Sequence, residues 1–240
     1  MADCHEHMGN YEKSHEVHQA ISERYHTSSF SWYFWCKRTG YGNVQEAQKI
    51  ADSFFESQEL PWYSNLTERA GIFYILSGQD EKAFDVFDRM FNFRKNPYRG
   101  FHLALLADAL GRFDKRDEVL QAVIEEGPSA PDYTDDTQSL AKAAGLLLSA
   151  LRKGEELDLA AIDAVIEGAP SGISTNLVYF IGRFLELRGS PEQAWDYFDR
   201  AAMSKDTLKY NHILACDAVR RLGYQPGCYP RTRSSAPSTD

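Results

Sequence analysis

The chain has 240 residues, of which 43% are hydrophobic and 25% are charged, a balance typical of folded globular proteins. Its formal net charge of −9 argues against nucleic acid or an anionic membrane as the partner, because both attract basic surfaces. No apolar run approaches the roughly 18 residues that cross a bilayer, so we expect no membrane-spanning segment.

Residues 1–24 contain a turn at Gly9-Asn10 followed by a helical segment. Only eight residues precede Gly9, which is fewer than a complete first helix of a hairpin needs. Two explanations stay open: the chain begins inside a repeat whose array continues on the N-terminal side, or the first helix is short and frayed.

Histidines concentrate in the same segment and form the one cluster with metal-ligand chemistry. The members of this cluster are Cys4, His5, His7, His15 and His18. His15 and His18 share a helix face, but their spacing differs from the four-residue spacing of an HExxH zinc motif. We therefore expect packing and surface roles for these histidines, and we keep metal binding as the alternative.

Residues 29–58 contain the most aromatic stretch of the chain, FSWYFWCKRTGYGN, followed by a helix from Val44 to Phe55. Five aromatic side chains in so short a stretch cannot all face one core. We expect most of them to pack between neighbouring repeats, and the alternative is an aromatic surface patch for a peptide.

Two further helical hairpins are expected between residues 62 and 126, separated by a turn at Asn96-Pro97. Residues 129–136, SAPDYTDD, are expected to form a loop that ends in helix-capping acids. Residues 137–168 are rich in small side chains, and the two helices predicted there are expected to pack closely.

The clearest hairpin spans residues 177–203 and breaks at Gly189-Ser190-Pro191. Pro191 suits the first turn of a helix, and Ser190 is expected to cap that helix. Gly182 is expected to let the two helices approach closely, while Phe198 fills the space between them.

A break glycine recurs along the chain at steps of 33 to 43 residues. These glycines are Gly9, Gly42, Gly78, Gly111, Gly154, Gly189 and Gly223. Gly78 and Gly189 also share their flanks, because each has a glycine seven residues before it and an Ala-x-x-x-Phe pair after it. A period of about 34 residues with one helical hairpin in each period predicts a helical solenoid.

The units around Gly78 and Gly189 share more of a common pattern. The matching residues are Gly71, Tyr74, Ala83, Phe87 and Pro97 in one unit, and Gly182, Leu185, Ala194 and Phe198 in the other. This pattern resembles that of the tetratricopeptide repeat (TPR) family; the units around Gly42 and Gly111 match in part, and the unit around Gly154 matches least.

The resemblance implies an all-α fold, namely an αα-superhelix in residues 1–227. It would be a right-handed solenoid of about six helical hairpins, with residues 208–223 as a C-terminal capping helix. We expect residues 228–240 to form a disordered tail, because Pro and Ser dominate there and no apolar period continues.

The resemblance also implies a concave groove that is lined by the first helix of each hairpin and holds a protein or peptide partner. The residues expected to face this groove are Trp32, Cys36, Glu68, Ile72, Phe101, Leu105, Tyr179 and Arg183. The resemblance implies that a TPR which clamps a carboxylate has several Lys, Arg and Asn residues along the groove. This lining offers mainly Arg183 and Asn176, so we do not expect a carboxylate clamp.

The sequence contains none of the patterns GxxxxGK[ST], GxSxG and GxGxxG, so we expect neither an enzyme nor a cofactor, and we assign no metal ligands. The predicted function is that of a protein-interaction scaffold or adaptor, either complete or a segment of a longer repeat protein. The alternatives are a regulatory or substrate-recruiting module of an enzyme complex, and a metal-binding solenoid that uses the N-terminal histidines.

Cys4, Cys36, Cys216 and Cys228 are scattered along the chain and form no CxxC pair. We therefore expect reduced, structural thiols. Because no secretory signal is visible either, we expect a cytoplasmic protein.

Overall fold

The computed structural model describes residue 5 and residues 8–25, 29–57, 59, 64–126, 136–204 and 210–223. All regular structure in these ranges is α-helical, which confirms the predicted all-α fold class. The helices are α2 (Tyr11–Arg24), α3 (Ser29–Thr39), α4 (Val44–Glu56), α5 (Asn65–Leu76), α6 (Asp80–Phe93), α7 (Pro97–Ala109), α8 (Phe113–Glu126), α9 (Asp136–Lys153), α10 (Leu159–Glu167), α11 (Ser171–Leu187), α12 (Pro191–Ala202) and α13 (Tyr210–Arg221).

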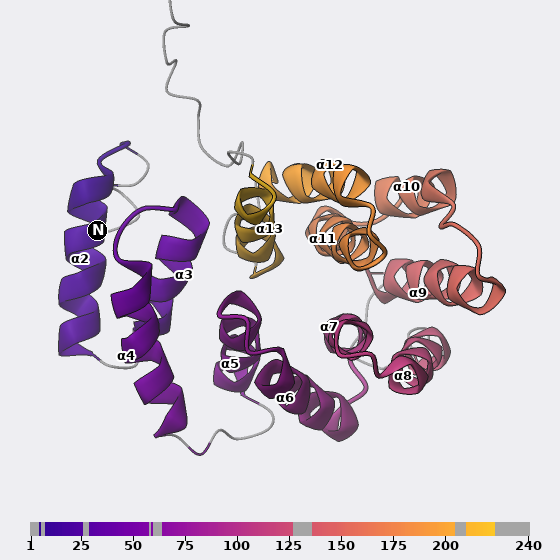
Figure 1. Ribbon diagram of the computed structural model, residues 1–240, viewed down its shortest axis with the longest axis horizontal. Coiled ribbons are helices and arrows are strands. Elements are labelled where there is room, and N and C mark those ends of the chain that lie inside the picture. The colour runs from indigo at the N-terminus through magenta and orange to yellow at the C-terminus, as the bar shows by residue number, and fades with distance from the viewer. Residues whose placement is uncertain are drawn as a thin grey trace, which may run out of the picture.

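Consecutive helices pair as hairpins, and each hairpin packs on the next, as in a helical-repeat solenoid (Figure 1). The right-handed superhelix stays a prediction. The tail expected at 228–240 lies outside the described residues. In the part of the chain that is described, no helix has both the length and the apolar character needed to span a bilayer.

Five of the seven predicted break glycines lie between the two helices of a hairpin, namely Gly42, Gly78, Gly111, Gly154 and Gly189, while Gly9 precedes α2 and Gly223 follows α13. All seven have a positive φ, between 66° and 89°, which an L side chain rarely adopts. At Gly78 the helix ends in a pair of hydrogen bonds: Gly78 N–H donates to the Ile75 carbonyl (3.1 Å) and Gln79 N–H to the Tyr74 carbonyl (2.8 Å). This pattern satisfies carbonyls that the helix end leaves free, and it recurs at Gly189.

Close approach inside the hairpins depends on two further glycines. A Cβ atom added at Gly71 would lie 2.7 Å from the Phe87 ring, and one added at Gly182 would lie 2.8 Å from the Phe198 ring. Both phenylalanines are completely buried, so their rings fill the space that the missing side chains leave. The predicted packing role of Gly182 and Phe198 is therefore confirmed, whereas Ser190 makes no side-chain cap hydrogen bond to α12.

The end of the array meets its beginning, because α13 packs on α3 and α5 as well as on α12 (Figure 1). Polar contacts join the two ends, beside the ring contact between Phe34 and Tyr210. Arg69 donates to the Tyr210 hydroxyl at 2.8 Å, Lys37 lies 2.6 Å from Asp217, and Arg220 donates to the carbonyls at the end of α3. These contacts join residues that are more than 140 positions apart in the sequence.

A second long-range contact forms where α11 packs on α7. The rings of Phe101 and Phe180 are stacked with their centroids 4.9 Å apart. At the other end of this contact, Arg188 donates to both carboxylate oxygens of Asp108, at 2.7 and 2.9 Å. Helices α7 and α11 therefore contact each other directly, although they belong to hairpins that are not consecutive.

Candidate binding sites

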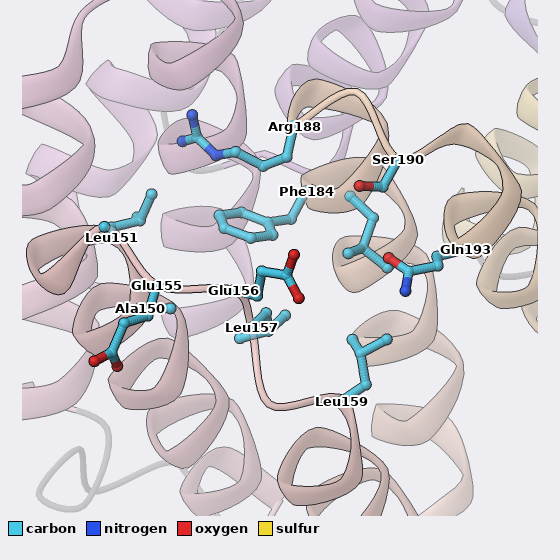
Figure 2. Close-up of a pocket in the computed structure, with 12 residues that line it drawn as sticks. Ala150, Leu151, Glu155, Glu156, Leu157, Leu159, Phe184, Arg188, Ser190 and Gln193 are labelled. Carbon is cyan, nitrogen blue, oxygen red and sulfur yellow. The ribbon is translucent and has the colours of Figure 1, made fainter.

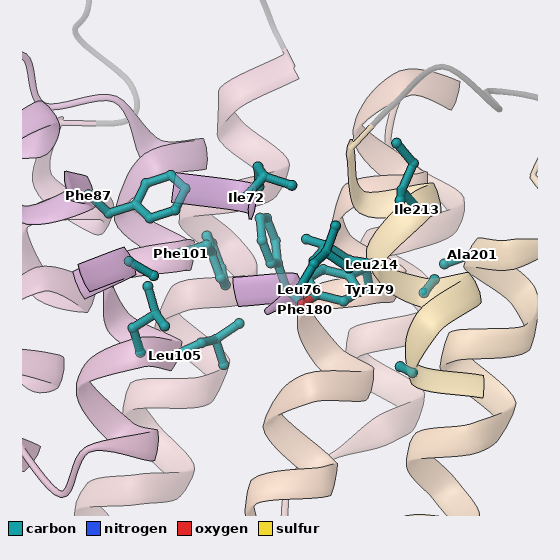
Figure 3. Packing of buried hydrophobic residues seen from close by; sticks show 14 of the residues in the cluster. Ile72, Leu76, Phe87, Phe101, Leu105, Tyr179, Phe180, Ala201, Ile213 and Leu214 are labelled. Carbon is teal, nitrogen blue, oxygen red and sulfur yellow. The ribbon is translucent and has the colours of Figure 1, made fainter. Parts of the chain in front are cut away.

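The residues expected to line an open groove lie mostly in the core. Six of the eight are buried: Trp32, Cys36, Ile72, Phe101, Leu105 and Tyr179. We expected these six residues to face an open groove, and this expectation is corrected. Helix α7 packs on α11, and α13 packs on α3 and α5, so the inner faces of the first helices are covered. Figure 3 shows Ile72, Phe101, Leu105 and Tyr179 within this packed interior.

The other two residues, Glu68 and Arg183, are half-buried and form ion pairs. Glu68 lies 3.3 Å from Arg99 of α7, and Arg183 lies 2.6 Å from Glu186 one turn later in α11. Whether any of the eight residues contacts a partner stays a prediction.

One cavity of about 380 Å³ remains at the closure, and we name it the axial pocket. It lies between the ends of α3 and α5, the start of α6, and the inner faces of α11 and α13. Its charged and polar wall is formed by Lys37, Tyr179, Arg183, Asp217 and Arg221. Two of the residues predicted for the groove, Tyr179 and Arg183, are thus brought together here with residues from both ends of the chain.

The charges around the axial pocket form a connected network. Glu186 accepts from Arg183 at 2.6 Å and from Arg221 at 2.8 Å. Burial alone would raise the pKa of Glu186, but the hydrogen bond from Arg221 and the charges of both arginines hold it below its ordinary value. Burial raises the pKa of the Tyr179 hydroxyl, against the opposing effect of Arg183 and Arg221, so this phenol is neutral near pH 7.

A second cavity, of about 450 Å³, opens between the α9–α10 turn and the α11–α12 turn, and we name it the side crevice. Its apolar wall includes Leu157, Leu159, Phe184 and Leu185. Figure 2 shows the Phe184 ring and the carboxylate of Glu156 turned toward the same space, with Arg188 at the edge.

The polar groups of the side crevice differ in how far they are already engaged. One terminal nitrogen of Arg188 donates to both carboxylate oxygens of Asp108, which Arg188 shares with Arg116. Glu156 is exposed and has no ion-pair or hydrogen-bond partner among the described residues. The hydroxyl of Ser190 makes no cap hydrogen bond with α12. The crevice therefore combines an apolar wall with polar groups that are free to bind.

Sequence reasoning did not identify the side crevice. One signal was present: the unit around Gly154 matches the repeat pattern least, and the step before it is the longest, at 43 residues. This is the unit whose second helix, α10, is the shortest of the described helices, with nine residues.

The N-terminal histidines have packing roles where the structure describes them. The His15 ring lies against Trp32, Trp35 and Tyr41, with centroids 5.5 to 6.0 Å apart. Among the described residues no group of three or more His, Cys, Asp and Glu side chains is placed to hold a metal ion. Cys4 and His7 lie outside the described residues, so metal binding through them stays untested.

The expectation of reduced cysteines holds at one position and fails at another. Cys36 is free, and burial raises the pKa of its thiol to about 12, which makes it unreactive near neutral pH. Cys216 is disulfide-bonded, so the inference of a cytoplasmic setting from reduced thiols loses its basis.

A comparison of the chain with protein-family models, curated proteins and solved structures finds no match. The resemblance to the TPR family therefore stays a prediction that rests on the repeat pattern.

Proposed function

We propose that this chain is a protein-interaction module of the helical-repeat type, which acts by binding a segment of a partner. The observation that carries the proposal is the side crevice. A cavity of about 450 Å³ lies within the usual size range of ligand sites, and its lining, which is more polar than apolar, joins leucine and phenylalanine side chains to free polar groups.

The position of the crevice suits a partner segment. It is formed by two consecutive hairpin turns, and turns and loops on a rigid scaffold are common recognition surfaces. Phe184 and Leu185 are buried at its base, so a large aliphatic or aromatic side chain that enters the crevice meets a fixed apolar surface.

The charge of the crevice favours a basic partner. Glu155 and Glu156 are exposed at its mouth, and the chain as a whole carries a net charge of −9. Arg188 is paired with Asp108 and Glu155 lies 3.8 Å from Lys153, so Glu156 is the carboxylate of the crevice without an ion pair among the described residues. We therefore propose a segment that places a large apolar residue next to lysine or arginine.

Selection of short peptides from a random display library tests the proposal. Peptides selected on the unmodified chain are expected to share an apolar residue beside a basic one. The Glu156→Lys variant is expected to bind them about five- to tenfold more weakly, since it replaces an attraction by a repulsion at a partly solvated site.

The matched control is Glu23→Lys, which makes the same charge change at an exposed position on α2. It is expected to leave the affinity unchanged. Selected peptides that bind both variants as well as they bind the unmodified chain would show that the crevice is not the site. A selection that enriches no peptide family would contradict the proposal itself.

A further inference from the structure

The axial pocket is lined by a tyrosine whose hydroxyl can be reached from the pocket. Tyr179 has only 4% of its surface exposed, and it lines the pocket together with Leu76 and Leu214 (Figure 3). Among the described residues, nothing forms a hydrogen bond with its hydroxyl. Because this hydroxyl opens into the pocket and no described residue engages it, it is available to a group that enters the pocket.

Cations from three helices line the same pocket as this hydroxyl. Lys37 comes from α3, Arg183 from α11 and Arg221 from α13, and all three line the pocket. They share two carboxylates, because Asp217 pairs with Lys37 and Arg221, while Glu186 pairs with Arg183 and Arg221.

The sharing leaves hydrogen-bond donors unused. Arg183 donates through one terminal nitrogen only, to Glu186, and its other N–H groups have no partner among the described residues. A guanidinium has five N–H donors arranged to match a carboxylate or a phosphate. The opposite wall of the pocket carries Asp80 and the carbonyl end of α5, so an anion is favoured only on the side of Tyr179 and Arg183.

We propose that the axial pocket binds a small-molecule oxyanion, a carboxylate or a phosphate, between the Tyr179 hydroxyl and the Arg183 guanidinium. Lys37 and Arg221 line the same pocket, but each is already paired with a carboxylate, Asp217 or Glu186. The volume of about 380 Å³ is at the lower end of the range for ligand pockets, which suits a metabolite-sized molecule. This site is separate from the side crevice and does not depend on the proposed function.

Binding there has a structural consequence. Lys37, Arg183 and Arg221 belong to the helices that close the array, so an anion held among them links its two ends. A ligand that binds the folded chain alone raises the unfolding temperature as its concentration rises.

The test uses two defined probes, inorganic phosphate and succinate, titrated into the whole chain by calorimetry at constant ionic strength. Thermal unfolding with each probe, against sodium chloride at the same ionic strength, provides an independent readout. Saturable binding of at least one probe is expected, together with a rise in the unfolding temperature. The stronger of the two probes shows whether the natural ligand carries phosphate or carboxylate.

Two variants locate the site. Tyr179→Phe removes only the hydroxyl oxygen and is expected to weaken binding about fivefold or more, as the loss of one hydrogen bond to a charged group does. The control is Tyr197→Phe on α12, whose hydroxyl donates to Asp163 at 3.1 Å and does not line the pocket; it is expected to bind as the unmodified chain does.

Arg183→Gln provides a second probe of the same wall and is expected to reduce binding further. Absence of saturable binding for both phosphate and succinate would overturn the inference. Equal affinities for the unmodified chain and Tyr179→Phe would overturn it as well. Neither result affects peptide binding at Glu156, so the outcome for the two sites is read separately.

Discussion

The hairpins α11/α12 and α9/α10 are neighbours, yet they are packed very differently. The second helix of the former buries Ala194, Tyr197, Phe198, Ala201 and Ala202. The second helix of the latter buries Ile162 and Ile166. The side crevice lies along the boundary between these two hairpins, where α10 supplies few large side chains.

The turns of the two hairpins do not explain this difference. Gly154 N–H donates to the Leu151 carbonyl and Glu155 N–H to the Ala150 carbonyl, which is the same paired pattern that ends α11 at Gly189. The two units therefore share the hairpin break and differ in the residues that fill the interior. A repeat array can therefore keep the hairpin turn, bury fewer large side chains in one unit, and form a cavity there without losing its fold.

The largest predicted effect concerns the contact that holds α11 on α7. The side chain of Asp108 is only 3% exposed and accepts from both Arg116 and Arg188. Asp108→Asn is expected to lower the free energy of unfolding by about 2–3 kcal/mol, because it leaves two guanidinium groups without their shared carboxylate in a buried site. Urea unfolding followed by circular dichroism measures the change.

The matched variant is Asp163→Asn, which removes a carboxylate between α10 and α12. Asp163 lies 2.8 Å from Arg200, but both side chains are about 40% exposed, at 39% and 43%. The loss is expected to stay below about 1 kcal/mol, since exposed pairs are well solvated. If Asp108→Asn and Asp163→Asn lower the free energy of unfolding equally, the α7–α11 contact stabilises the chain no more than the α10–α12 contact does.

Alanine in place of a helical glycine is expected to change stability in opposite directions in the two hairpins. Gly182→Ala places a Cβ atom 2.8 Å from the Phe198 ring and is expected to destabilise the chain by about 1–3 kcal/mol. In α9, a Cβ atom at Gly145 meets nothing within 4 Å. Gly145→Ala is expected to stabilise the chain by about 0.5–1 kcal/mol, because it reduces the backbone freedom lost in forming the helix.

Thermal and urea unfolding of both glycine variants measure the sign directly. If Gly145→Ala destabilises the chain, the α9/α10 hairpin is packed more tightly than the side crevice next to it indicates. A stabilised Gly182→Ala would mean that the α11/α12 pair can separate to admit a methyl group.

The sequence predicted the hairpins well because their determinants are local. Gly71 and Phe87 lie in one repeat with the break at Gly78, and Gly182 and Phe198 lie in another with the break at Gly189. Helical spacing places such residues on facing surfaces without knowledge of the rest of the chain. The all-α fold class and the hairpin breaks were therefore predictable.

The sites were not predictable in the same way, because they depend on contacts between distant segments. Helical spacing identified the face of α11 that carries Tyr179, but not the elements that cover it. That depends on the closure, where Arg69 meets Tyr210 and Lys37 meets Asp217. Periodicity within a repeat carries no signal for such pairs, so most residues assigned to an open groove lie in the core, and Tyr179 and Arg183 line the axial pocket.

The smallest predicted effect is a pH dependence that distinguishes the half-buried Glu186 of α11 from an exposed glutamate. The pKa of Glu186 in the folded chain is held below its ordinary value, so its stabilising contribution is complete above that value and is lost as the pH falls through the lowered pKa. Glu186→Gln is expected to reduce the loss of stability on acidification below about pH 4.5, the ordinary range of a glutamate carboxyl.

Glu23→Gln on α2, whose carboxylate is exposed, is the control and is expected to leave the slope of stability against pH unchanged. Urea midpoints measured between pH 3 and pH 7 give the slope for each variant. Identical slopes for Glu186→Gln and the unmodified chain would mean that the link from Glu186 to Arg221 of α13 does not stabilise the closure of the array.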